Sequence, residues 1–240
     1  MEELNLPLDR STSDELDLAV DTPVGHAACV LPANQLPTRL VQLAAGLVLY
    51  GVSIAVYVRS ELGLDPWDVF HQGIAERTGI SFGMIVVLIG LVVLSLWLPL
   101  RTRPGIGTVA NVLVVGTVAD VALGQFGSPH GLAPRVIMLV AAIIGNGVAT
   151  GLYIGSGLGA GPRDGLTVAV VARTGWSIRR TRTVVEILVL AIGFALGGTV
   201  GVGTLLYAVA IGPLMHVTVP LFSRDRRGPE PAALAACATS

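Results

Sequence analysis

The chain has 240 residues, of which 52% are hydrophobic and only 13% are charged, and its formal net charge is −1. Its mean hydropathy is +0.75. An ordinary water-soluble domain is excluded, because such domains are about 25% charged and lack apolar runs of membrane-spanning length. The sequence therefore predicts an all-α polytopic membrane protein.

Six apolar stretches are long enough to span a bilayer, since a helix needs roughly 20 apolar residues to cross a hydrocarbon core of about 30 Å. The stretches are 39–57, 81–100, 107–123, 135–155, 177–196 and 203–222. Two shorter helices, 66–78 and 162–174, are expected between the first and second spans and between the fourth and fifth.

Four regions are expected along the chain. Residues 1–36 are acidic and contain proline, which is typical of a disordered tail rather than a signal peptide. Residues 37–124 and 133–222 form two membrane repeats, and 223–240 form a cytoplasmic tail that begins with a basic patch.

The two membrane regions repeat one pattern at an offset of 96 residues without a gap. Over residues 39–120 there are 22 identities in 82 pairs, many of them Gly, Pro, Ser or Thr at predicted helix boundaries. Pro66 pairs with Pro162, and Asp68 pairs with Asp164. The sequence therefore predicts one fold written twice.

Two topologies are open. A short helix of about 13 residues reaches only about 20 Å. If it dips into the membrane and returns, each repeat crosses three times, and the second repeat is inverted. Transporters built this way place a central site near short or broken helices. If the short helices cross, the chain has eight spans and parallel repeats.

The distribution of arginine does not choose between these topologies. The positive-inside rule divides the 15 Arg residues 12 to 3 with six spans and 11 to 4 with eight, with both termini cytoplasmic in either case. Helix length favours six spans with two re-entrant short helices.

The segment "LDPWD" is typical of a helix start. Asp65 is the expected N-cap, Pro66 the first helical residue and Asp68 the third, where a carboxylate faces free N–H groups. The second copy keeps Pro162 and Asp164. Other boundary residues are expected to end or cap helices: Gly79, Gly175, Ser81, Ser177, Thr108 and Thr204.

Four charged residues are the candidate lining of a solute path: Asp68, Arg163, Asp164 and Glu186. A helix start inside a membrane protein leaves backbone groups that must face water, protein or a solute. Trp67 occupies the position equivalent to Arg163, and an arginine there favours an anionic group. Glu186 lies near the predicted bilayer midplane, where carboxylates are functional candidates.

The same residues also have a structural interpretation. The two aspartates can act as helix caps, and Arg163 can pair with Asp164 at the membrane interface. Arg182 and Glu186 can form an i,i+4 salt bridge. Capping and pairing alone would explain most of the repeated polar residues.

Four further polar residues are weaker candidates. Asp120 and His216 share one repeat position near helix ends, where solvation at the interface is the favoured interpretation. Asn111 and Asn146 lie within spans and are expected to hydrogen-bond neighbouring helices rather than a ligand.

Catalysis, metal binding and nucleic-acid binding find no support in the sequence. The four His residues are scattered, Cys29 and Cys237 lie in the tails, and no hydrolase or metalloprotease motif occurs. The chain contains no Lys, and its Arg residues mostly flank spans. We expect no enzyme activity, no cofactor, no metal and no nucleic-acid partner.

Four segments together carry a resemblance: "LGLDPWDVFHQGIAERTGISFG", "RTRPGIGTVANVLVVGTVAD", "GLYIGSGLGAGPRDGLTVAVVARTGWSIRRTRTVVE" and "LGGTVGVGTLLYAVAIGP". They resemble the YczE-type membrane proteins of the YczE/YyaS/YitT group, over about residues 39–213. The resemblance implies a bacterial inner (plasma) membrane protein and a loose link with secondary-metabolite production. It names no substrate.

Two hypotheses follow. The first is a small-solute transporter or channel built on the internal repeat. The second is a non-transporting membrane scaffold or accessory protein. The expected partners are the lipid bilayer, a small solute or ion, and further copies of the chain.

Overall fold

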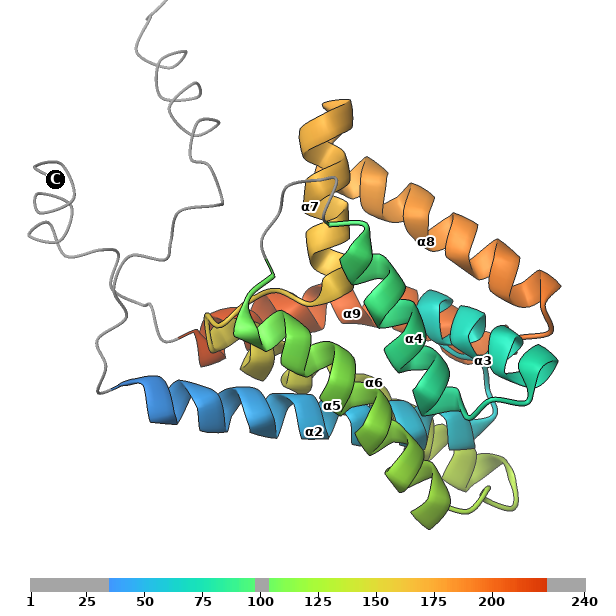
Figure 1. The fold of residues 1–240 in the computed structure, drawn as a ribbon. Helices are drawn as coiled ribbons and strands as arrows, with labels where there is room; N and C mark the ends of the chain where they lie inside the picture. The colour runs from blue at the N-terminus through green and yellow to red at the C-terminus, as the bar shows by residue number, and fades with distance from the viewer. Residues whose placement is uncertain (1–34, 98–103, 224–240) are drawn as a thin grey trace, which may run out of the picture. The chain divides into compact units, whose positions relative to one another are not determined.

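The computed structural model describes residues 35–97 and 104–223, and within them it contains eight α-helices and no strand (Figure 1). The helices are α2 (Leu36–Ser60), α3 (Pro66–Thr78), α4 (Phe82–Ser95), α5 (Ile106–Gln125), α6 (Leu132–Gly155), α7 (Pro162–Thr174), α8 (Ile178–Ala195) and α9 (Val202–Phe222). The predicted all-α fold class is confirmed. The predicted tails lie outside the described residues, apart from 35, 36 and 223.

Four of these helices, α2, α5, α6 and α9, are long and apolar enough to cross a membrane. The helix α4 has 14 residues and reaches about 21 Å, and α8 carries Arg179, Arg180, Arg182 and Glu186 in 18 residues. With α3 and α4 taken as one span bent by 115°, the number rises to five. By length and composition, the described residues therefore contain four or five candidate spans, and the predicted number of six is not confirmed by this criterion.

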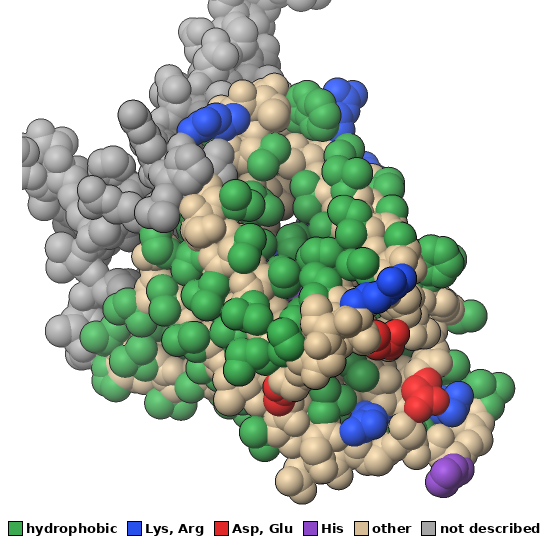
Figure 2. All heavy atoms as spheres, turned by 45° about the vertical axis from the view of Figure 1, so that its right-hand side comes forward, with side chains coloured by type: hydrophobic (Ala, Val, Ile, Leu, Met, Phe, Trp, Pro, Cys, Tyr) green, Lys and Arg blue, Asp and Glu red, His purple; other side chains and the backbone are tan. Residues whose placement is uncertain are grey.

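The outer surface of the helices is apolar, as contact with lipid requires. On α9, side chains such as Val202, Leu205, Val209 and Val217 are 67–76% exposed. Apolar side chains cover much of the face shown in Figure 2, and charged ones are few there. This surface agrees with a protein embedded in a bilayer.

Most helix ends lie where local sequence signals predict them. Asp65 is the N-cap of α3, and its carboxylate accepts a hydrogen bond from the Asp68 N–H at 2.6 Å. Ser81 caps α4 and Ser177 caps α8. Gly79 and Gly175 follow the short helices with φ of 72° and 68°, a left-handed conformation that glycine adopts without strain.

The prediction that Thr108 and Thr204 cap the last helix of each repeat holds only for Thr204, which closes a capping box at the third position of α9. The N-caps of α5 and α9 are Gly105 and Gly201. Thr108 instead donates its hydroxyl to the Ala160 carbonyl at 2.7 Å, and Thr204 accepts from the Gly201 N–H at 3.2 Å. The hydroxyl of Thr108 is thus used between distant segments rather than within its own helix.

The helices α2 and α6 pack side by side in opposite directions. Arg39, in the first turn of α2, donates to the carbonyl of Ser156, which follows α6, at 3.3 Å. Arg135, in the first turn of α6, pairs with Glu61, which follows α2, at 2.6 Å. A Cβ on Gly46 would lie 2.8 Å from the Tyr153 nitrogen, so glycine permits close approach of the two backbones.

Two other helix pairs run parallel. Gly51 of α2 packs on Val115 of α5, and eight residues further along Arg59 donates to the Leu123 carbonyl at 2.5 Å. In the same way Gly147 and Gly155 of α6 pack on Leu214 and Phe222 of α9. Within each half of the chain, the first and last long helices therefore point the same way.

Two loops make matching contacts. The Gly107 N–H donates to the Leu158 carbonyl at 2.9 Å, and the Gly203 N–H donates to the Leu62 carbonyl at 2.8 Å. Gly203 is 96 residues after Gly107, and Leu158 is 96 residues after Leu62. The start of the last helix in each half thus rests on the loop of the other half.

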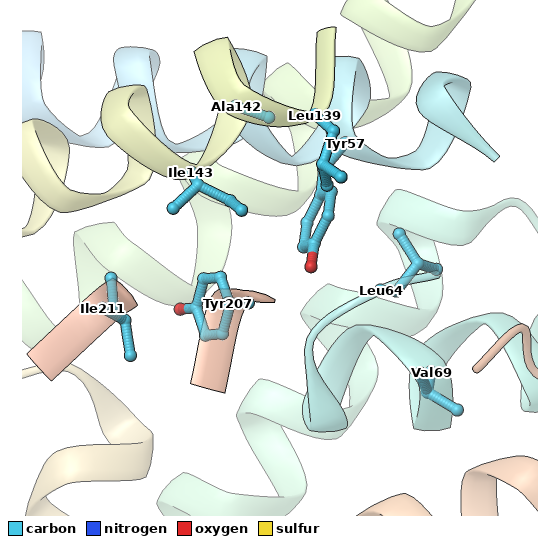
Figure 3. Close-up of a cluster of buried hydrophobic side chains, with 8 residues drawn as sticks. All are labelled: Tyr57, Leu64, Val69, Leu139, Ala142, Ile143, Tyr207 and Ile211. Atoms are coloured by element: carbon cyan, nitrogen blue, oxygen red, sulfur yellow. The ribbon is translucent and has the colours of Figure 1, made fainter. Parts of the chain in front are cut away.

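One buried cluster joins the two halves: Tyr57, Leu64, Val69, Leu139, Ala142, Ile143, Tyr207 and Ile211 (Figure 3). The rings of Tyr57 and Tyr207 stack with centroids 5.9 Å apart. Tyr57 also donates its hydroxyl to the Gly203 carbonyl at 2.7 Å, so its polar end is satisfied inside the cluster.

Candidate functional site

A cavity of about 90 Å³ lies inside the described helices, and its wall includes residues of α3, α4, α5, α7, α8 and α9. One water molecule needs roughly 10–15 Å³ measured in this way. The cavity can therefore hold several water molecules or a small solute.

The N-terminal ends of the two short helices meet beside this cavity. Arg163, the second residue of α7, lies with Nη1 3.5 Å from Asp65 Oδ2 and Nη2 3.5 Å from Asp68 Oδ1. The carboxylates are 4% and 1% exposed, whereas the Arg163 side chain is 25% exposed. One guanidinium thus balances two buried carboxylates from the other half of the chain.

Trp67 completes the surroundings of Arg163. The guanidinium carbon lies 5.1 Å from the centre of the indole ring, within the range of a cation–π contact. Trp67 and Arg163, which share one repeat position, are therefore in contact with each other.

Asp68 has a second neighbour within its own helix. His71 Nδ1 lies 3.2 Å from Asp68 Oδ1, and His71 is 2% exposed. The other oxygen of Asp68, Oδ2, is buried and has no hydrogen-bond partner among the described residues. A buried acceptor without a partner is costly.

Asp164 has different surroundings from its counterpart Asp68. Tyr153 donates its hydroxyl to Asp164 Oδ2 at 2.8 Å. Tyr153 and Asp164 line the cavity, and so does Gly161, the N-cap of α7. The interpretation that Arg163 pairs with Asp164 is wrong, because Arg163 reaches Asp65 and Asp68 on α3 instead.

Arg182 and Glu186 form the predicted i,i+4 pair, with Nε 2.9 Å from Oε1. Both also line the cavity, and their side chains are 43% and 37% exposed. The structural and functional interpretations of Glu186 are thus compatible: it is paired, and it faces the cavity.

The structure brings the four candidate path residues to one place. Arg163, Asp164 and Glu186 line the cavity, and Asp68 contacts Arg163. Pro66 and Pro162 open the two short helices and also line it.

The weaker candidate residues lie in different surroundings. Asn111 lines the cavity, whereas Asn146 accepts a hydrogen bond from the Tyr207 hydroxyl at 3.3 Å and so joins two helices, as predicted. Asp120 accepts from the Ser81 hydroxyl at 2.5 Å, at the start of α4.

Sequence reasoning missed the aromatic part of the wall. Tyr50, Tyr153 and Tyr207 line the cavity, and the rings of Tyr50 and Tyr153 meet edge to face with centroids 6.0 Å apart. The repeat of Tyr57 at Tyr153 was the available signal. Asp65 was predicted only as a cap, and its second oxygen faces Arg163.

The cavity wall is built from matching positions of the two halves. Of its 25 lining residues, 18 form nine pairs separated by 96 positions. Four pairs show how far the chemistry differs within them: Trp67 with Arg163, Val86 with Arg182, Gly90 with Glu186, and Asn111 with Tyr207. The wall is matched in position and unlike in charge.

Among the described residues, no group of three or more His, Cys, Asp or Glu side chains is arranged to hold a metal ion. The charged groups in and beside the cavity are four carboxylates and two guanidinium groups: Asp65, Asp68, Asp164, Glu186, Arg163 and Arg182. With all of them ionised, the formal charge is −4 + 2 = −2.

These helices, with an apolar exterior and a charged internal cavity, define a polytopic α-helical membrane protein. Residues 37–220 match the family of unknown function DUF6198, and the chain belongs to this family.

The relatives agree with this assignment. The chain is 37% identical over 198 residues to an uncharacterized protein of Haemophilus influenzae, covering 82% of this chain and 90% of the relative. It is 30% identical over 179 residues to the uncharacterized membrane protein YczE of Bacillus subtilis, covering 73% and 83%. It is 26% identical over 192 residues to the uncharacterized protein YyaS of Bacillus subtilis, covering 76% and 96%. The resemblance to YczE-type membrane proteins is confirmed. No solved structure matches the chain.

Proposed function

We propose that this protein is a small-solute transporter or channel of the bacterial inner membrane, built on two inverted repeats, with the cavity as its solute site. The observation that carries the proposal is the cavity wall, in which 18 of 25 residues come from matched positions of the two halves. Repeat transporters place their site at such an interface.

Helix direction supports the inverted arrangement. Because α2 and α5 run parallel, the chain between them must return across the membrane once, through α4 or through α3 and α4 together. The same argument applies to α7 and α8 between α6 and α9. Three crossings per half give six in all, with α6 entering opposite to α2, as their antiparallel packing requires.

The alternative with eight spans needs the reverse geometry. If both short helices crossed, α2 and α5 would point in opposite directions, and α2 and α6 would point the same way. The contacts of Gly51 with Val115 and of Arg39 with Ser156 oppose this. With six crossings, the excess of Arg on the side of the termini makes both termini cytoplasmic.

The depth of the cavity also supports a solute site. Val115 is the tenth residue of the 20 in α5, and Ile211 is the tenth of the 21 in α9; both line the cavity. The cavity is therefore near half the length of two spanning helices, at the depth where transporters bind their solutes. A catalytic role is not part of the proposal.

The sidedness of two matched positions tests the topology. Ile80 and Trp176 are 96 residues apart, lie two residues after the ends of the short helices, and are 40% and 43% exposed. Each is changed to Cys in a chain whose Cys29 and Cys237 are Ser, and intact cells are labelled with a membrane-impermeant thiol reagent. We expect opposite sides; the same side would exclude inverted repeats.

Flux through purified protein in liposomes tests the function. Rubidium, methylammonium, chloride, glycine and glycerol are offered as labelled solutes of different charge. We expect protein-dependent flux of at least one, lost in Asp164→Asn. If no solute crosses, and a second membrane protein co-purifies with the native chain, the scaffold or accessory role replaces this proposal.

A further inference from the structure

We infer that the cavity binds a small monovalent cation at Asp164, in the place that a side chain of the first repeat would fill if the two halves were alike. The inference rests on the proposed function for the role of this cation as the solute. Its binding is measured separately from transport.

One of the two matched positions already holds a cation, the guanidinium of Arg163. In α7 the second residue is Arg163, and it reaches across to Asp68, the third residue of α3, with a closest N–O distance of 3.5 Å. The carboxylate at the third position of one short helix is thus balanced by a cation from the second position of the other.

The matching half lacks its cation. The second residue of α3 is Trp67, which carries no charge, and the third residue of α7 is Asp164. Within the described residues Asp164 has the Tyr153 hydroxyl as its hydrogen-bond donor and no ion pair. A hydroxyl satisfies one lone pair and brings no positive charge to the carboxylate. Arg182 attracts Asp164 electrostatically, but it is already paired with Glu186.

The N-cap residues of the two short helices also differ in charge. The N-cap of α3 is Asp65, whose carboxylate faces Arg163, and the N-cap of α7 is Gly161, which carries no charge. A Cβ on Gly161 would lie 3.2 Å from Tyr153 Oη and 3.3 Å from Asp164 Oδ2. Any larger residue at position 161 would therefore press on Tyr153 and Asp164, and glycine keeps this side of the carboxylate free of a side chain.

The charge of the site sets the valence of the ligand. Four carboxylates and two guanidinium groups give −2. The two helix N-termini that meet there add roughly +0.5 each. The sum is about −1, which a single positive charge neutralises. Beside the cavity, the buried Asp68 Oδ2 also has no hydrogen-bond partner in the described part of the chain.

The wall suits a cation in its apolar part as well. Tyr50 and Tyr153 line the cavity with their rings edge to face, and the Trp67 ring already carries the Arg163 guanidinium on its face. Aromatic faces attract cations and repel anions. The anionic group that the sequence indicated for Arg163 is supplied by Asp65 and Asp68 of the protein itself.

The experiment measures binding to the full-length protein in detergent. The unfolding temperature is followed while sodium, potassium or methylammonium chloride replaces N-methyl-D-glucamine chloride at constant concentration. We expect at least one small cation to raise this temperature in a saturable manner. The affinity for it should fall by roughly 10- to 100-fold in Asp164→Asn, which keeps the shape of the side chain and removes the charge.

A variant of Trp67 gives the sharper test. Trp67→Arg supplies the cation that the matching half lacks, so its unfolding temperature without added small cation should rise towards that of the cation-bound native protein. Added cation should then have no further effect. Trp67→Leu removes the ring without adding charge and should keep the cation response.

Three results would overturn the inference. The first is that no small cation changes the unfolding temperature of the native protein, and the second is that a cation raises that of Asp164→Asn equally. The third is that the stabilisation disappears when gluconate replaces chloride as the anion, which would mean that chloride binds. Cation binding without flux leaves the inference standing and removes the proposed function. Flux of a neutral or anionic solute, with no effect of cations on the unfolding temperature, would support the proposed function and overturn the inference.

Discussion

The indole ring of Trp97, just after α4, packs directly against Gly165 of α7, where even a methyl group would collide with the ring. At the matching positions the glycine is on the other partner: Gly193 of α8 packs on the backbone of Val69 and Phe70 in α3. Glycine is the small partner in both places: it faces the Trp97 ring after α4 in one case and the backbone of the short helix α3 in the other.

This arrangement predicts that changing Gly165 and Trp97 together destabilises the protein less than the sum of the two single changes. Gly165→Val should destabilise the protein by about 1–3 kcal/mol through overpacking, and Trp97→Gly by about 3–5 kcal/mol through the cavity it leaves. The double variant reproduces the combination found at Val69 and Gly193 and should recover part of the loss. Unfolding temperatures in detergent measure all three, and strict additivity of the two losses would contradict the prediction.

Removing Arg163 should destabilise the meeting point of the short helices. Arg163→Gln leaves two buried carboxylates without their cation, and breaking a buried pair costs about 3–5 kcal/mol. A second change, Asp65→Asn, should restore part of this stability because it removes one of the stranded charges. The matched control is Arg179→Gln on the exposed start of α8, which should leave the unfolding temperature nearly unchanged.

Glu186→Gln should separate function from stability. Its ion pair with Arg182 is partly exposed, and such i,i+4 pairs contribute only about 0.3–0.5 kcal/mol. Because Glu186 lines the cavity, the same change should abolish flux in liposomes. The exposed Glu76→Gln is the control, and it should retain flux. A large loss of stability with unchanged flux would assign Glu186 a purely structural role.

Alanine should be poorly tolerated at Gly63 and Gly159, the matched glycines in the loops that precede the short helices. Gly63 has φ +104° and packs on Gly201, and its counterpart Gly159 has φ +136° and packs on Thr108. Either Gly→Ala change adds backbone strain of about 1–3 kcal/mol and a steric clash. Gly124, in α5 with open space around it, is the control: Gly124→Ala should be neutral or slightly stabilising. Equal unfolding temperatures for all three variants would show that Gly63 and Gly159 are not needed for their backbone conformation or close packing.

Local signals predicted much of the fold. The short helices cover Pro66–Thr78 and Pro162–Thr174, as expected, because proline at the start and glycine after the end act within a few residues. The lengths of α4 and α8 were less predictable. An apolar run continues through the end of α4, so hydropathy alone does not locate where the helix stops.

The candidate site was only partly predictable, because its contacts join different halves of the chain. The sequence indicated that Arg163, Asp164 and Asp68 matter, and the 96-residue offset placed them at matched positions. It could not indicate that Arg163 crosses to α3 rather than pairing with its neighbour, since both partners are carboxylates at helix starts. The hydroxyl of Thr108 was misassigned for the same reason: its acceptor, the Ala160 carbonyl, is on a distant loop.

The reciprocal hydrogen bonds of Gly107 and Gly203 have a consequence for how the protein is made. Gly107 bonds to Leu158, which leaves the ribosome 158 − 107 = 51 residues later, so the start of α5 has no anchor when it is first inserted. The partner of Arg39, the Ser156 carbonyl, is also synthesised long after α2. The first half therefore lacks these contacts until the second half has been translated, and a chain that ends before residue 156 can form neither of them.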